Sequence, residues 1–151
     1  MSEWYLQKAN VEELDSLLHI AISTFREAFE HQNKKEDFEA YIREFLNRET
    51  LCNELSNPNS QFYFAYNEAN IIGYIKLNFY EAQTEKMGNT AMELQRIYVV
   101  SEYQGSGIGS WLLNQCFEIA AQRNLRIIWL GVWEKNTSAI RFYERHGFEI
   151  F

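Results

Sequence analysis

Three glycines alternate over five residues in the second half of the chain, at Gly105, Gly107 and Gly109. They follow an apolar stretch typical of a strand and lead into an amphipathic helix that begins near Ile108. Because glycine has no Cβ, the backbone can turn tightly here and a ligand can approach the main chain closely. The first N–H groups of a helix have no intrahelical partner and form a binding site for an anion. The spacing therefore predicts a phosphate-bearing ligand at a strand–loop–helix junction.

Two common phosphate-binding motifs fit this stretch poorly. The dinucleotide motif G-x-G-x-x-G requires a glycine where Ser110 stands, and no acidic residue about 20 positions on ends a second strand to hold a ribose. A P-loop requires a lysine before the Ser or Thr, and the order Ile108-Gly109-Ser110 offers none.

The elements around this turn predict a mixed α/β sheet in one domain, residues 1–151, with helices on both faces. We expect strands at 4–8, 61–66, 71–80, 92–100, 126–133 and 148–151, with helices at 11–29, 38–46, 108–122 and 136–147 and a helical turn at 50–55. Asn10 and Glu13 form a capping-box pattern at the first helix, and Asn136 and Gly147 are the expected N-cap and C′ residues of the last. The two strand–helix–strand crossovers in the C-terminal half predict parallel, right-handed connections.

The composition predicts a soluble cytoplasmic protein with a well-packed core. Apolar residues make up 46% of the 151 residues, yet no apolar run approaches the roughly 18 residues of a membrane span. The N-terminus lacks the order of a signal peptide. Cys52 and Cys116 are too few for a disulfide framework, and their spacing fits no metal motif.

The net charge of −7 is unevenly distributed, because residues 1–60 carry twelve Asp and Glu against six Lys and Arg. No basic stripe is present to meet nucleic-acid phosphates, so nucleic acid is not an expected partner. A cationic partner suits the acidic half electrostatically, although the same residues can simply be solvated helix faces.

The hexapeptide Gln104-Gly105-Ser106-Gly107-Ile108-Gly109 resembles the Q/R-x-x-G-x-G/A signature of the GNAT N-acetyltransferase superfamily. Residues 94–99 resemble the fourth strand of that family, and residues 130–148 resemble its fifth strand and fourth helix. The amino-acid sequence of these two stretches is most similar to the bacterial spermidine/spermine N-acetyltransferase branch. The resemblance implies a GNAT fold with a splayed fourth and fifth strand pair, acetyl-CoA as co-substrate, and no metal.

The resemblance also implies where acetyl-CoA binds. The pyrophosphate would lie on the N–H groups of the glycine turn, and the pantetheine amides would pair with the fourth strand where it splays from the fifth at a bulge. An N–H near Val99 would polarise the thioester carbonyl. Asn136 would orient the pantetheine, or it is only a helix cap. The implied cofactor residues are Ile97, Tyr98, Val99, Gln104, Gly105, Ser106, Gly107, Ile108, Gly109, Ser110 and Asn136.

Two residues occupy the positions of catalytic groups in the family. Glu93 matches the general base of several members, or it binds the ammonium group of the substrate or faces solvent. Tyr143 matches the tyrosine that protonates the departing thiolate, and the alternative is an aromatic residue that fills the core.

The acceptor is expected to be a small cationic amine, with a polyamine such as spermidine or spermine first. Acidic residues between the first two helices, including Glu27, Glu30 and Glu36, would suit a polyamine, a lysine-rich peptide or an aminoglycoside. The alternatives are a protein N-terminus or lysine as acceptor, and a non-catalytic acyl-CoA-binding module.

The C-terminus departs from the family pattern. GNAT domains usually end with one more strand after the sixth, whereas this chain ends at Phe151, four residues past Gly147. The final strand is therefore expected to be missing, which leaves an unpaired edge. An edge of this kind predicts a homodimer or reduced stability.

Overall fold

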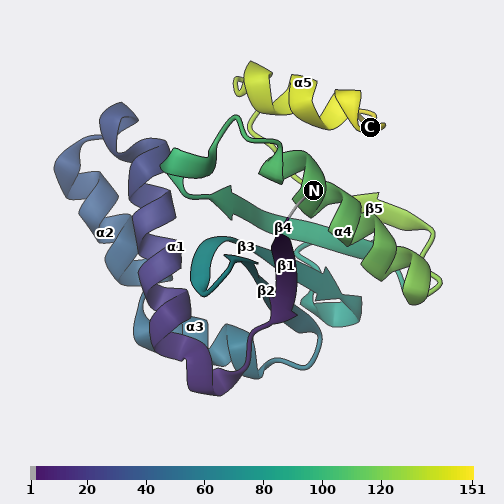
Figure 1. Cartoon of the computed structure of the whole chain (residues 1–151), viewed down its shortest axis with the longest axis horizontal. Coiled ribbons are helices and arrows are strands. Elements are labelled where there is room, and N and C mark those ends of the chain that lie inside the picture. The colour runs from purple at the N-terminus through teal and green to yellow at the C-terminus, as the bar shows by residue number, and fades with distance from the viewer. Residues whose placement is uncertain (1–2) are drawn as a thin grey trace.

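The computed structural model describes residues 3–151, in which five strands form one mixed sheet in the order β1-β2-β3-β4-β5 (Figure 1). The strands are β1 Trp4–Lys8, β2 Ser60–Asn67, β3 Asn70–Phe79, β4 Ala91–Val99 and β5 Ile127–Trp129. The first four run antiparallel to their neighbours, and β5 runs parallel to β4. The parallel pair confirms the expected crossover through the helix after the glycine turn.

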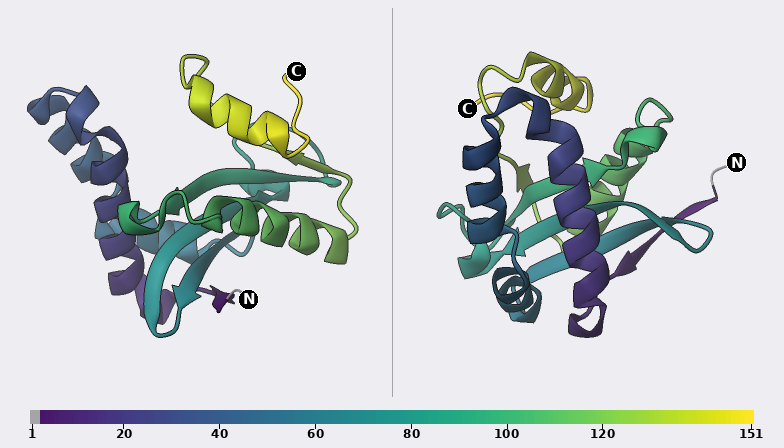
Figure 2. Two further views of the ribbon diagram at one scale, coloured as in Figure 1. Left: turned by 45° about the horizontal axis from the view of Figure 1, so that its top comes forward. Right: turned by 90° about the vertical axis from the view of Figure 1, so that its left-hand side faces the viewer.

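Helices cover both faces of this sheet, as the sequence predicted (Figure 2). They are α1 Leu14–Phe29, α2 Lys35–Phe45, α3 Arg48–Ser56, α4 Ile108–Gln122 and α5 Thr137–Arg145. Short 3₁₀ helices span Val11–Glu13, Glu30–Gln32, Tyr80–Ala82 and Ser101–Tyr103. The first three α-helices bury their apolar stripes on one face, and α4 buries its own on the other.

Successive side chains of β3 point to opposite faces of the sheet, so this strand contributes to two separate core clusters. Tyr74 points into the cluster under α1, α2 and α3, whereas Ile75 and Leu77 point into the cluster under α4. A strand buried on both faces has no polar side and shows little alternation in hydrophobicity.

Local signals in the sequence set the ends of the helices. The Asn10 side chain accepts from the Glu12 N–H, and the Glu13 carboxylate accepts from the Asn10 N–H, so the expected capping box forms before α1. Asn136 caps α5, and Gly147 follows that helix with φ 95°, as expected for a C′ glycine. The turn expected at 50–55 is a full helix, α3, capped by Asn47.

A bulge interrupts β4 where the sheet begins to splay. Lys76 pairs with Arg96 and the next residue of β3, Leu77, pairs with Leu94, so Gln95 has no partner on β3. Pairing between β4 and β5 is confined to the segment from Ala91 to Glu93, and beyond it β4 continues alone on that side among the described residues. The splayed β4/β5 pair is therefore present, with a bulge beside it.

Two strand predictions were wrong in extent. The strand expected at 126–133 forms only over Ile127–Trp129, because the chain turns away from β4 after Trp129. Residues 148–151 form no strand. Phe148 packs its ring against Phe117 and Tyr143, while Phe151 is 89% exposed.

Among residues 3–151, no helix is long and apolar enough to cross a membrane.

Candidate active site

The glycine turn adopts the conformation that its composition predicts. Gly105 and Gly107 have φ angles of 82° and 92°, in the left-handed region, and a Cβ at either position would meet no atom within 4 Å. Gly107 is the N-cap of α4, and the first intrahelical bond runs from the Trp111 N–H to its carbonyl. The N–H groups of residues 108–110 precede that bond, so they are available to an anion at the positive end of the helix dipole. The turn is open, and its N–H groups can donate hydrogen bonds to an anion.

The loop before the glycine turn is tied to the end of β4. The Gln104 side chain donates to the Val99 carbonyl at 3.2 Å, and the Ser106 hydroxyl donates to the Tyr103 carbonyl. These bonds hold the turn close to the part of β4 that, within residues 3–151, pairs with no strand on the β5 side.

Helix α5 packs directly against the start of α4. A Cβ on Gly109 would lie 3.3 Å from Cζ of Phe142, so only glycine allows this approach without a shift of the ring. His146 faces the Phe142 carbonyl through Nδ1 at 2.7 Å and the Ser110 hydroxyl through Nε2 at 3.0 Å. Since a carbonyl only accepts, Nδ1 carries the hydrogen, and in the neutral imidazole Nε2 then accepts from Ser110. The Ser110 hydroxyl is thus committed to α5, and only its N–H is free for an anion.

A cleft of about 440 Å³ opens between β4 and the segment that carries α5. The described residues that line it are Ala28, Phe29, Gln32, Leu94, Gln95, Arg96, Ile97, Tyr98, Val132, Trp133, Lys135, Asn136, Ala139 and Tyr143. Of the predicted site residues, Ile97, Tyr98, Asn136 and Tyr143 meet here. Val99 and the glycine turn lie outside this lining.

Tyr143 forms part of the wall opposite β4. Its ring contacts Phe142 and Phe148, and burial raises the pKa of its phenol to about 12. Its hydroxyl has no hydrogen-bond partner among residues 3–151. A neutral phenol with an uncommitted hydrogen is suited to donate a proton into the cleft.

Glu93 lies beside the cleft without lining it, and it is only 3% exposed. Its Oε1 accepts from Asn78 Nδ2 at 2.9 Å and from the Thr84 N–H at 2.8 Å, and its Oε2 accepts from the Thr84 hydroxyl at 2.7 Å. Both carboxylate oxygens are therefore engaged within the protein.

The three predicted substrate carboxylates do not meet in the cleft. Glu27 accepts from the Ser101 N–H and hydroxyl, and so caps the 3₁₀ helix after β4. Glu30 pairs with Arg26 at 3.1 Å, and Glu36 is exposed in the first turn of α2. The charged residues that do line the cleft, Arg96 and Lys135, are both cations.

A cluster of three charged side chains, which the sequence did not predict, lies under the cleft. Arg96 makes a two-bond contact with Glu54 at 2.8 and 3.1 Å, and Lys76 Nζ lies 3.6 Å from the same carboxylate. The pKa of Lys76 is lowered to about 8, mainly by burial and secondly by the positive charge of Arg96. In the sequence, the one sign of this cluster is that Lys76 and Arg96 are charged residues within two mainly apolar strand segments.

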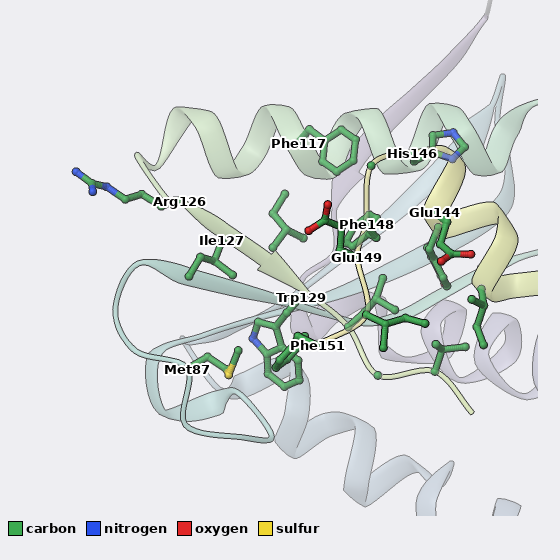
Figure 3. Close-up of a pocket in the computed structure, with 18 of the residues that line it drawn as sticks. Met87, Phe117, Arg126, Ile127, Trp129, Glu144, His146, Phe148, Glu149 and Phe151 are labelled. Atoms are coloured by element: carbon green, nitrogen blue, oxygen red, sulfur yellow. The ribbon is translucent and has the colours of Figure 1, made fainter. Parts of the chain in front are cut away.

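A second, larger hollow of about 840 Å³ lies beside β5 and residues 146–151 (Figure 3), and Tyr143 lines both this hollow and the cleft. We call it the C-terminal groove, and its apolar lining includes Phe117 from α4, Ile127 and Trp129 from β5, and Phe148 and Phe151. Met87, Arg126, Glu144, His146 and Glu149 also border it. Among the described residues, no group of three or more His, Cys, Asp or Glu side chains could hold a metal ion.

Comparison with known proteins agrees with this geometry. The sequence profile of the acetyltransferase (GNAT) family matches residues 14–148. An uncharacterized N-acetyltransferase of Lactobacillus delbrueckii subsp. lactis is 32% identical over 139 residues, which are 92% of this chain and 80% of that protein. The spermidine N(1)-acetyltransferase of Thermoplasma acidophilum is 28% identical, over 96% of this chain and 88% of its own.

The solved structures show the same fold. The PaiA N-acetyltransferase of Thermoplasma acidophilum, in complex with coenzyme A, superposes with a TM-score of 0.82 at 27% identity, over 100% of this chain and 92% of that one. A metagenomic aminoglycoside acetyltransferase shares the fold with a TM-score of 0.74 at 16% identity, over 99% of this chain and 92% of that chain. The chain belongs to the GNAT acetyltransferase family, and it is an acetyl-CoA-dependent N-acetyltransferase.

Proposed function

We propose that acetyl-CoA binds with its pyrophosphate on the glycine turn and its pantetheine in the cleft, and that a primary amine attacks the thioester directly in a ternary complex. The observation that carries this proposal is the position of the cleft. It opens where β4 leaves β5, so one wall is a strand edge that pairs with no other strand among the described residues, and the other holds Tyr143. The pantetheine amides pair with residues 97–99 of that edge, and Asn136 stands at its far side.

Two protons move in this reaction. The amine, with a pKa of about 10 in water, must lose its proton before it attacks. The CoA thiolate that leaves must gain one, and we assign that proton to Tyr143. Because both Glu93 oxygens are already bonded, we assign deprotonation of the amine to solvent and give Glu93 a positioning role.

We propose a polyamine such as spermidine or spermine as the acceptor. This assignment rests on relatives, since the Thermoplasma acidophilum and Bacillus subtilis proteins are named as spermidine or spermine acetyltransferases. The B. subtilis protein is 29% identical over 85 residues, 56% of each chain. The acidic balance of residues 1–60 favours the approach of a polycation.

The charge of the cleft favours a second candidate. Arg96 and Lys135 are the charged residues of its described lining, and a carboxylate or carbonyl group beside the amine would suit them better than a second ammonium group would. A peptide N-terminus or an amino acid has such a group.

Thiol release from acetyl-CoA, measured with spermidine, spermine, an N-terminal peptide, a lysine-rich peptide and an aminoglycoside, separates these acceptors. We expect the polyamines to give the highest kcat/KM. A higher value for the N-terminal peptide would replace the first candidate with the second. Tight CoA binding with no release from any amine would indicate a binding module without turnover.

A further inference from the structure

A row of polar side chains connects the loop at 80–90 to the floor of the cleft. The Thr84 N–H and hydroxyl donate to Glu93, and Asn78 Nδ2 donates to Glu93 Oε1 at 2.9 Å. The same Asn78 nitrogen donates to Gln95 Oε1 at 2.8 Å. The row ends at Gln95, which is half-buried and lines the cleft.

The orientation of each group in this row follows from its neighbour. The Glu93 carboxylate only accepts hydrogen bonds, so the Asn78 amide must present its nitrogen to it. The other end of that amide, Oδ1, accepts from the Ser60 hydroxyl at 2.9 Å. The second hydrogen on Asn78 Nδ2 then requires an acceptor, and Gln95 supplies its Oε1.

This chain of constraints leaves the Gln95 nitrogen uncommitted. With Oε1 held by Asn78, the Nε2 group lies at the opposite end of the carboxamide. It has no hydrogen-bond acceptor among residues 3–151. Gln95 therefore has two N–H donors available on Nε2, while its Oε1 is held by Asn78.

The bulge in β4 determines the face of the sheet on which the Gln95 side chain lies. Because Gln95 has no partner on β3, its side chain shares a face with Glu93 and Arg96, and does not point into the cluster under α4. The cleft that it lines has Tyr143 in its opposite wall. Arg96 lies beside Gln95, and Glu54 orients its guanidinium through a two-bond contact.

We propose that the Gln95 carboxamide donates a hydrogen bond to the carbonyl oxygen of the bound acetyl group, and that Glu93 orients it through Asn78. This inference rests on the proposed function. As the amine nitrogen bonds to the carbonyl carbon, the π electron pair moves to that oxygen, and the Gln95 N–H stabilises the developing negative charge. The carbonyl then re-forms as the C–S bond breaks, the thiolate takes a proton from Tyr143, and the acetylated nitrogen loses its extra proton to solvent. Glu93 touches no substrate in this scheme and is a positioning residue.

The kinetic test is Gln95→Met, which keeps the length of the side chain and removes its donors. We expect kcat to fall by about 10- to 100-fold, with KM for acetyl-CoA little changed, by the same factor for every amine that the wild type acetylates. Gln7→Met on the exposed face of β1 is the matched control and should retain full activity. An unchanged kcat would overturn the proposal, as would a loss confined to amines that carry a carbonyl or carboxylate group.

A binding measurement tests the contact without any acceptor. Infrared spectra of acetyl-CoA labelled with ¹³C at the carbonyl would be recorded in complex with wild type and with Gln95→Met. We expect a lower carbonyl stretching frequency in the wild-type complex, because a hydrogen bond weakens the C=O bond. Equal frequencies would overturn the proposal. If the wild type transfers acetyl to no amine, the proposed function fails, and this comparison still decides the role of Gln95.

The orienting role of Glu93 is tested by a double-mutant cycle with Glu93→Gln. If Glu93 acts through Gln95, Glu93→Gln should lower kcat in the wild type and have little further effect in Gln95→Met. It should also raise the carbonyl frequency toward that of Gln95→Met. Fully additive losses, or an unshifted frequency, would show that Glu93 acts independently. Thermal unfolding of each variant identifies any loss that comes from misfolding.

Discussion

Burial sets the protonation of the chemically active side chains in this protein. It raises the pKa of the Tyr143 phenol and lowers that of the Lys76 ammonium, since in each case it penalises the charged form. Tyr143 consequently keeps its proton throughout the neutral range. Burial raises the pKa of the Cys116 thiol to about 12, so this cysteine is a packing residue and a poor nucleophile.

Replacement of Tyr143 by phenylalanine removes the proposed proton donor and retains the ring. We expect kcat to fall by about 100-fold while the dissociation constant of CoA, measured by calorimetry, stays nearly unchanged. Because its pKa is about 12, the wild-type rate should show no ionisation of this tyrosine between pH 7 and about 10. Tyr80→Phe, at an exposed position, is the control. An unchanged kcat would remove Tyr143 from the mechanism.

Replacement of Lys76 by an apolar residue is expected to stabilise the folded protein. It is 5% exposed and shares one carboxylate, Glu54, with Arg96. A pKa lowered to about 8 means that the unfolded state binds the proton more strongly, so wild-type stability rises as pH increases from about 8 toward 10.5. Lys76→Met should therefore be more stable than wild type at pH 7 by up to roughly 3 kcal/mol.

The pH dependence of that difference is the diagnostic measurement. Denaturant unfolding of both proteins at pH 7 and at pH 10.5 should show the advantage of Lys76→Met shrinking toward zero at the higher pH. The other titrating groups are common to both proteins and cancel. A difference that is constant with pH would mean that packing, and not the charge, causes it.

At the scale of elements, the site depends on how α4 begins. Gly107 is at once the N-cap of α4 and a residue with φ 92°, and the helix N–H groups that follow it face the anion site. Helix α5 packs against the same turn, because Gly109 has no side chain and the Phe142 ring can lie close to its backbone. The proposed anion site and the wall that carries Tyr143 thus share one junction.

Gly107→Ala should weaken CoA binding at least tenfold, because the left-handed conformation costs an L-residue about 1–2 kcal/mol and relaxation would turn the N–H groups away. Gly88→Ala is a matched control, since Gly88 has φ 87° and open space around it but lies outside the site. Both should lower the melting temperature similarly, and only Gly107→Ala should affect CoA affinity in calorimetry. Equal affinities would show that the turn does not bind the pyrophosphate.

At the scale of the whole molecule, the C-terminal groove is an uncovered hollow with a mainly apolar lining. It lies beside β5, which has no strand on its outer side among the described residues, and it carries the exposed Ile150 and Phe151. Contiguous apolar surfaces and unpaired strand edges promote association.

We therefore expect the chain to self-associate at high concentration through the C-terminal groove. The double variant Ile150→Ser/Phe151→Ser should shift the sedimentation profile toward the monomer, whereas Val11→Ser, at an exposed apolar residue elsewhere, should not. A wild type that sediments as a monomer over the whole accessible concentration range would contradict this expectation.

The sequence by itself determined the elements whose signals are local. The glycine turn, the capping box at Asn10 and the cap at Asn136 depend on neighbouring residues, and the hairpin depends on two adjacent apolar runs, so each was predictable. These elements, with the family resemblance, were sufficient for the mixed sheet with its splayed strands and for the GNAT family.

Only the tertiary structure decided which polar groups meet. Glu93 is held by Asn78 and Thr84, from another strand and another loop, and Glu27 is held by Ser101, 74 residues away. A bulge at Gln95 changes which face of β4 each side chain occupies, and no periodicity in the sequence marks it. Periodicity reports burial along one segment, whereas the chemistry of a cleft depends on contacts between segments, and these are fixed only when the sheet and helices pack together.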